Sequence, residues 1–174
     1  LGEFLLDPRN IFIADTGTAL GLPGSTVTET PADLTTVAGS VTAAGTVRAT
    51  SGNTTDWVQI TPDVIEGYAA GNITLEATRQ IVIGDAVDRT AEGDLTLRAG
   101  LGGPAGTGNI TQRAGADVSV NGVLTLQTGT GAISLGADLR ATGVVLSAVG
   151  NITQIGGTIA HRVAGTELPL AVTA

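Results

Sequence analysis

The chain lacks three residue types that would point to particular chemistry. Its 174 residues include no cysteine, methionine or lysine, and all eight basic residues are arginines. The absence of cysteine excludes a disulfide framework and a thiolate metal site. It fits a cytosolic protein, and equally an exported protein that must stay unfolded during secretion.

Charged residues are scarce, and their balance is acidic. Sixteen carboxylates against eight arginines give a net charge of −8 at pH 7. Nucleic acids and anionic lipid surfaces are bound largely through basic contacts to phosphate, so neither is an expected partner. Apolar runs such as VVLSAV (144–149) are far shorter than the roughly 20 residues of a membrane-spanning helix. We therefore expect no membrane span in this segment.

Aromatic residues are also rare, since Phe4, Phe12, Trp57 and Tyr68 are the only four. A globular core of this size normally contains more of them, because each ring buries a large apolar area. A core made almost entirely of valine, isoleucine, leucine and alanine indicates a narrow interior with a small, repeated cross-section.

The chain contains a short repeat: glycine, a polar or small residue, an aliphatic residue, threonine or serine, and usually a second aliphatic residue. It occurs as GNITLEA at 71, GDLTLRA at 93, GNITQRA at 108, GVLTLQT at 122, GAISLGA at 131 and GNITQIG at 150. Alternation with a period of two places Ile73 and Leu75 on one face of a strand and Thr74 on the other. The outward threonines and serines are expected to form ladders along two faces.

The repeats fall into blocks that start at Gly71, Gly93, Gly122 and Gly143, each with three strand-like pieces. Three short strands per rung of roughly 21 residues predict an all-β parallel β-helix, in which stacked rungs share one aliphatic core. The stretch GLGGPAGTG (100–108) has no lysine and is followed by a strand, so it is not a phosphate loop. It is interpreted as an insertion that leaves the register unchanged.

Residues 71–174 are therefore predicted to form regular rungs, and residues 1–70 irregular rungs of the same continuous stack. FLLDPRNIFIAD (4–15) predicts two strands separated by a bend at Asp7-Pro8. Residues 17–39, rich in turn formers, and residues 50–70 are predicted to be loop excursions. In the second excursion, Thr61, Pro62 and Asp63 indicate the N-cap and first turn of a short helix.

Four segments, in this order, resemble a known family: LLDPRNIFI (5–13), PADL (31–34), TPDVIEG (61–67) and GNITLEATRQIVIG (71–84). Together they are similar to the passenger region of filamentous-haemagglutinin-like bacterial exoproteins. The resemblance implies a right-handed β-helix, two-partner secretion through a dedicated outer-membrane protein, and a role in adhesion or aggregation. The Asn-Pro-rich secretion motifs of the family's N-terminal domain are missing, so the chain is expected to be an interior piece of a larger protein.

The sequence offers no residue pattern for catalysis, a cofactor or a metal. His161, the single histidine, stands beside Arg162 without a second imidazole or a cysteine, which favours a surface or corner position over a functional one. β-Helix enzymes that act on polysaccharides use clustered carboxylates, but the candidates here occupy different strand and corner positions. They are Glu76, Glu92, Asp94, Asp117 and Asp138.

Trp57 and Tyr68 are the two side chains predicted as a candidate interaction surface. They lie in the irregular stretch NTTDWVQITPDVIEGYAAG (53–71), where an exposed amphipathic ring favours recognition. The alternative is that both rings cover the side of the stack.

The expected function is structural rather than enzymatic. The chain is predicted to be a stiff, cofactor-free segment of a large secreted or cell-surface bacterial exoprotein that supports cell adhesion or aggregation. Whether it contacts a host cell, a bacterium or a glycan is not specified by these residues. One alternative is a self-assembling extracellular filament subunit, because open ends of a stack are unpaired strand edges that invite end-to-end association. A less favoured alternative is a β-helix carbohydrate-active enzyme.

Overall fold

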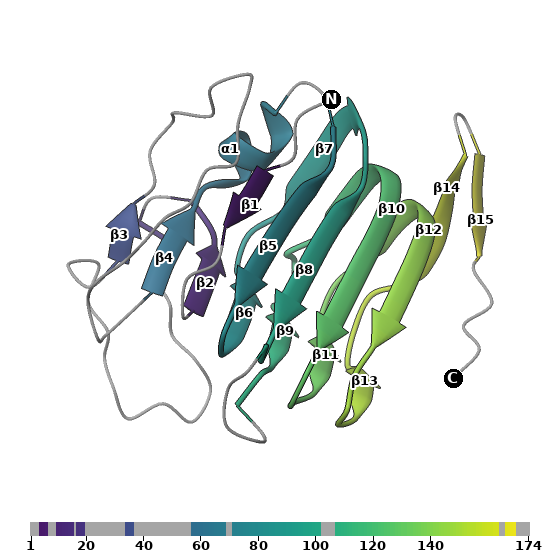
Figure 1. Cartoon of the computed structure of the whole chain (residues 1–174). Coiled ribbons are helices and arrows are strands. Elements are labelled where there is room, and N and C mark those ends of the chain that lie inside the picture. The colour runs from purple at the N-terminus through teal and green to yellow at the C-terminus, as the bar shows by residue number, and fades with distance from the viewer. Residues whose placement is uncertain are drawn as a thin grey trace.

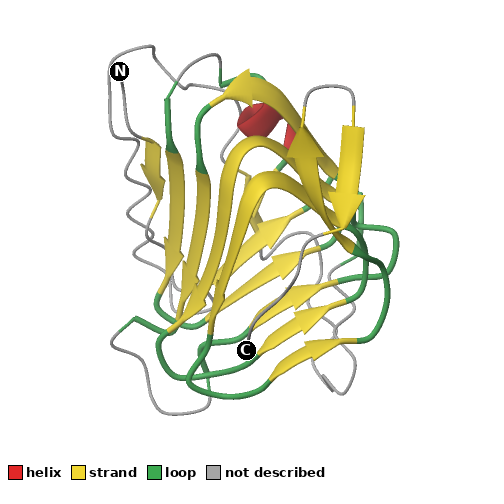
Figure 2. Ribbon diagram, turned by 90° about the vertical axis from the view of Figure 1, so that its right-hand side faces the viewer, coloured by secondary structure: helices red, strands yellow, loops and turns green. Residues whose placement is uncertain are grey.

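Two β-sheets face each other across one aliphatic core (Figures 1 and 2). The computed structural model describes residues 4–6, 10–15, 17–19, 34–36, 57–68, 71–101, 107–163 and 166–169. Within these residues the regular structure is almost entirely β-strand, and the one helix, α1 (Pro62–Glu66), has five residues.

The strands are divided between a first and a second sheet. Among the described residues the first sheet contains β1 (Phe4–Leu6), β5 (Ile73–Ala77), β7 (Val87–Glu92), β8 (Leu95–Ala99), β10 (Val118–Thr128), β12 (Leu139–Ser147), β14 (Ile159–Val163) and β15 (Thr166–Pro169). The second contains β2 (Asn10–Ile13), β3 (Leu34–Thr36), β4 (Trp57–Ile60), β6 (Gln80–Ile83), β9 (Ile110–Gln112), β11 (Ile133–Leu135) and β13 (Ile152–Gln154).

Equivalent residues of successive repeats meet in register. In the first sheet Ile73 pairs with Leu95, and Leu95 pairs with Leu124. In the second sheet Ile81 pairs with Ile110, which pairs with Ile133. These pairs are parallel, whereas β14 and β15 pair antiparallel. Each aliphatic side chain therefore packs on an aliphatic side chain of the next repeat, and each contributes about 1.5–3 kcal/mol by leaving water.

The prediction of a right-handed parallel β-helix with three short strands per rung is wrong. Backbone pairing gathers the described strands into two parallel sheets. The third piece of one block and the first piece of the next are joined in one long strand, as β10 and β12 show (Figure 2).

The physical reason lies at the glycines, which were expected to separate strands. Gly122 and Gly143 lie inside β10 and β12, and the pairing of these two strands continues past them with a register shift between Val120 and Val123. A Cβ on Gly122 would lie 2.1 Å from the carbonyl oxygen of Gly93. Without a side chain the backbone bends closely against its neighbour while the ladder of hydrogen bonds continues.

The positions and faces of the predicted strands are confirmed. In β5, β8 and the second half of β10, buried and partly exposed residues alternate. Thr74, Thr96 and Thr125 form an outward ladder in the first sheet. A second ladder, of Thr111, Ser134 and Thr153, runs along the second sheet. β8 and β9, the strands on either side of the 100–108 insertion, pair in register with the repeats before and after them, as expected.

The predicted short helix is also confirmed, and it packs over one end of the core. Thr61 is the N-cap and Pro62 begins the helix, although the Thr61 side chain makes no capping hydrogen bond. Ile65 is buried in the main core, and a carboxylate oxygen of Glu66 accepts a 2.7 Å hydrogen bond from the backbone N–H of Asp88 in β7. Much of the two predicted excursions, residues 20–33, 37–39, 50–56 and 69–70, lies outside the described residues. Their described parts are not only loop, because β3 and β4 fall within them and pair in the second sheet.

Candidate functional site

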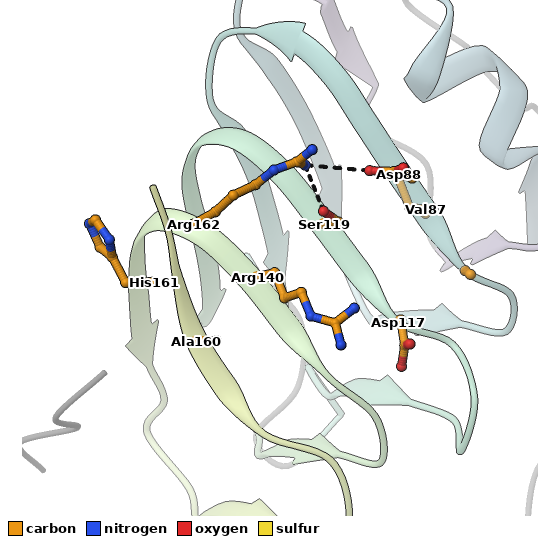
Figure 3. Close-up of a pocket in the computed structure, with 9 residues that line it drawn as sticks. Val87, Asp88, Asp117, Ser119, Arg140, Ala160, His161 and Arg162 are labelled. Atoms are coloured by element: carbon orange, nitrogen blue, oxygen red, sulfur yellow. Dashed lines mark hydrogen bonds and ion pairs between the residues drawn. The ribbon is translucent and has the colours of Figure 1, made fainter. Parts of the chain in front are cut away.

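A hollow of about 350 Å³ lies on the outer surface of the first sheet, over β7, β10, β12 and β14 (Figure 3). Its lining contains charged side chains of both signs. The lining residues are Ala86, Val87, Asp88, Asp117, Ser119, Arg140, Ala160, His161 and Arg162.

The hollow follows from a lateral row of outward-facing residues. Ser119 pairs with Asp88 on one side and with Arg140 on the other, and Arg140 pairs with Ala160. Side chains alternate across a strand, so all four belong to the same face. The row changes from polar side chains to a methyl group at Ala160, which leaves space beside the two arginines.

Arg162 reaches back across the row from β14. Its Nη1 donates a 2.6 Å hydrogen bond to Ser119 Oγ and lies 3.4 Å from Asp88 Oδ1. Arg140 Nη2 donates a 2.6 Å hydrogen bond to Asp138 Oδ2 at the edge of the hollow. Because about a third of each guanidinium side chain is exposed, these pairs contribute at most about 1 kcal/mol each to stability. These pairs hold the guanidinium donors of Arg140 and Arg162 at fixed positions.

The chemistry of the hollow is hydrogen bonding rather than covalent catalysis. Ser119 Oγ contacts the guanidinium of Arg162, which is permanently protonated and cannot act as a general base. His161 occupies the end of an inward row, since it pairs with Ala141, which pairs with Val120. The arginines offer donors and the aspartates offer acceptors, and each arginine is paired with an aspartate, Arg162 also with Ser119.

The carboxylate candidates are partly stacked, contrary to the expectation that no cluster would form. Asp117 precedes β10 at the position where Asp138 precedes β12, and Asp117 Oδ1 accepts a 3.1 Å hydrogen bond from the N–H of Asp138. Asp94 Oδ1 accepts a 2.9 Å bond from Val123 N–H in the same way. These corner side chains bond to the backbone of the next repeat, which identifies them as structural links. Glu76 forms an ion pair with Arg98 on the outer face.

Removing one of these links gives a testable prediction. Asp138 Oδ1 accepts hydrogen bonds from the N–H (2.7 Å) and the Oγ1 (3.1 Å) of Thr158. Hydrogen bonds to a charged acceptor contribute about 1.5–3 kcal/mol, so Asp138→Ala is expected to lower the free energy of unfolding by about 2 kcal/mol. Urea denaturation followed by circular dichroism measures this. The control, Asp88→Ala, changes a side chain that is 66% exposed and should stay within about 0.5 kcal/mol of the parent. Equal losses in the two variants would contradict the structural role.

The candidate interaction residues Trp57 and Tyr68 are both buried, with 3% and 7% of their surface exposed. Trp57 lies on the outer face of the second sheet in a small cluster with Phe12, Ala14 and Val82, and Tyr68 belongs to the main core. Neither ring is therefore an exposed contact surface: Trp57 covers the second sheet and Tyr68 lies in the core. The irregular sequence around them gave no signal that α1 and the outer cluster would bury them.

The outer cluster is closed on one side by a cation. The Arg113 guanidinium carbon lies 5.0 Å from the centroid of the Phe12 ring, within the range of a cation–π contact. Burial lowers the pKa of Arg113, and the nearby carboxylate of Asp85 partly offsets that effect. Arg113 Nη1 also donates a 2.7 Å hydrogen bond to the carbonyl oxygen of Ala19. These contacts are structural, because they attach a neighbouring segment to the sheet.

Arg89 was missed by the sequence reasoning, although it is fully buried. Its guanidinium donates to the carbonyl oxygens of Gly93 (2.6 Å) and Gly71 (2.7 Å), and more weakly to those of Ala91 and Glu92. Burial lowers its pKa, with partial compensation from the carboxylate of Asp94. The available signal was period-two alternation in AVDRTAE, which places Arg89 on the same inward face as Val87.

Within the described part of the chain, no three His, Cys, Asp or Glu side chains are grouped so as to hold a metal ion. The helix there is too short and too polar to cross a membrane. Comparison with protein-family models, curated proteins and solved structures gives no match for this chain. The resemblance to filamentous-haemagglutinin-like exoproteins therefore stays a prediction.

Proposed function

We propose that this chain is a structural and adhesive segment of a large secreted or cell-surface bacterial exoprotein. The observation that carries the proposal is the in-register parallel pairing of equivalent residues through successive repeats. Bending such a stack requires breaking backbone hydrogen bonds in both sheets, and buried unpaired backbone groups are costly. A stiff spacer follows from that arrangement.

The surface chemistry supports a passive role. Two ladders of outward threonine and serine residues run along the sheets, and the arginines of the hollow over β7, β10, β12 and β14 are held by neighbouring side chains. Contacts through such a surface are individually weak and gain strength by repetition along a long chain. Export through an outer-membrane partner belongs to the same proposal, and the lack of cysteine is compatible with it.

Adhesion blocking by monovalent antibody fragments tests the proposal. Fab fragments raised against residues 107–163 are added to cells that produce the native protein, at concentrations that saturate the surface. Adhesion and cell–cell aggregation are expected to fall several-fold, because the fragments cover the outer face. A Fab fragment against a different protein of the same cell surface is the control.

Unchanged adhesion and aggregation at saturating Fab would contradict the proposal. An enzymatic role makes a different prediction, namely release of reducing ends from a polysaccharide by the purified chain. In that case Asp117→Asn should abolish the release while the protein stays folded.

A further inference from the structure

The helix α1 stands at a point in the chain where the later repeats have a strand. β7 ends at Glu92, directly before Gly93, and the first part of β10 runs directly into Gly122. α1 ends at Glu66, shortly before Gly71, which begins the first regular repeat. A strand in the place of α1 would lie beside β7, as β7 lies beside β10. The chain instead packs a helix against β7 (Figure 1).

The two edges of β7 have different partners. Among the described strands β10 is the one that pairs with β7, and the N–H of Val87 donates a 2.8 Å hydrogen bond to the carbonyl oxygen of Asp117 on that side. Backbone groups of successive residues point to opposite sides of a strand, so the N–H of Asp88 points to the other edge. There it donates its 2.7 Å hydrogen bond to a carboxylate oxygen of Glu66. The Glu66 side chain therefore takes the place of a carbonyl group on a neighbouring strand.

The helix is anchored at this position by apolar contacts. Ile65, in α1, and Tyr68, just after it, are buried in the main core, and Val64 is partly buried against it. Burial of an isoleucine side chain contributes about 1.5–3 kcal/mol. The helix is thus held over the edge of β7 by the same core that holds the strands together.

The covered edge also carries charges of one sign on the helix. Asp63 is exposed and Glu66 is half-buried, and the chain as a whole has a net charge of −8. Natural sheets protect their edges from pairing with other strands by covering them with a helix and by placing charges there. Both features are present beside β7.

We infer that α1 is an edge cap: it occupies the place of a strand beside β7 and prevents a further repeat or another chain from adding to the first sheet there. A repeat placed before this segment in a longer polypeptide therefore cannot pair with β7 while α1 is in place. The inference rests on the contacts between α1 and β7 and is independent of the proposed adhesive role.

Amide hydrogen exchange of the whole chain, followed by nuclear magnetic resonance, tests the cap. The amide of Asp88 is expected to be protected in the parent and to exchange about tenfold or more faster in Glu66→Ala, because the charged acceptor is lost. Glu66→Gln keeps an oxygen acceptor and should retain most of the protection. The amide of Val87, bonded to Asp117 on the other edge, is the internal control and should be unchanged. Equal exchange at Asp88 in the parent and in Glu66→Ala would overturn the inference.

Sedimentation velocity tests whether the uncapped edge accepts another strand. The double variant Ile65→Ala, Glu66→Ala removes both the apolar anchor and the edge acceptor. It is expected to self-associate with a dissociation constant about tenfold or more below that of the parent, because an uncovered edge pairs with other chains. Gly115→Ala, in an exposed turn between β9 and β10, controls for destabilisation alone and should associate like the parent.

Hydrogen exchange also locates the new contact. In the double variant the amide of Asp88 should exchange rapidly at low concentration and more slowly as concentration rises, with circular dichroism confirming that the sheets stay folded. The inference is overturned if the folded double variant associates no more than the parent, or if it associates without slower exchange at Asp88. The comparison of Glu66→Ala with Glu66→Gln decides the matter if the double variant does not fold.

Discussion

Replacing Arg89 with methionine is expected to lower the free energy of unfolding by about 3 kcal/mol or more. Methionine fills most of the same volume, so the loss comes from hydrogen bonding rather than from a cavity. The two strongest acceptors, the carbonyl oxygens of Gly93 and Gly71, would lose their 2.6 and 2.7 Å donors. Each buried acceptor without a donor costs about 1–3 kcal/mol.

Urea denaturation followed by the fluorescence of Trp57, the single tryptophan, measures this change, with circular dichroism as a second probe. Arg98→Met is the matched control. Arg98 is also an arginine on a strand of the first sheet, but its side chain is 36% exposed and is paired with Glu76. Its loss should cost less than about 1 kcal/mol. Similar losses of unfolding free energy in the two variants would show that the hydrogen bonds from Arg89 to Gly93 and Gly71 do not stabilise the fold.

Gly93→Ala is expected to be strongly destabilising. Gly93 has φ of +121°, and a Cβ there would lie 2.1 Å from the carbonyl oxygen of Gly71. The new methyl group therefore combines backbone strain with a clash against backbone that is part of the neighbouring repeat. We expect a loss of about 3 kcal/mol or more, since strain of this kind alone costs about 1–3 kcal/mol.

Gly115→Ala separates the two contributions, because Gly115 also has a positive φ, +79°, but nothing lies within 4 Å of a Cβ built on it. That variant should lose only the conformational cost of about 1–2 kcal/mol. Gly143→Ala, where the nearest atoms are side-chain carbons of Val123 at 3.6 Å or more, should be close to neutral. If Gly93→Ala and Gly115→Ala were equally stable in urea, the close approach of the two backbones would be refuted.

Strand positions and faces were predictable because they depend on local alternation. The alternation in the sequence predicts that Ile73 and Leu75 point inward and that Thr74 points outward. In the structure Ile73 and Leu75 are buried and Thr74 is half-buried. The short helix was also predictable from local sequence, because Pro62 at its first position favours a helix start.

The joining of strands into two sheets was not predictable from the same pattern. A glycine at the start of a repeat unit is compatible with the end of one strand and equally with a bend inside a longer strand. The outcome depends on whether the ladder continues across these glycines, and at Gly122 that depends on close backbone contact with Gly93 of the neighbouring repeat. Such contact is a tertiary property that leaves no local trace.

The hollow was missed for a related reason. Asp88, Ser119, Arg140 and Ala160 are spread over more than seventy residues of sequence and meet only through lateral register. A register based on the glycines conceals the hollow, and it also conceals the stacking of Asp117 on Asp138. Aligning the pieces VDRTA, DVSVN, DLRAT and TIAHRV by their inward residues would have exposed both features.

The size and location of the native polypeptide test the central claim most directly. Antibodies against residues 107–163 are used on immunoblots of surface, medium and cytoplasmic fractions of the producing cell, and the reactive band is sequenced from both ends. The proposed function predicts a polypeptide many times larger than 17.2 kDa, outside the cell, with further repeats adjoining the segment. A polypeptide of about 17.2 kDa confined to the cytoplasm would contradict it.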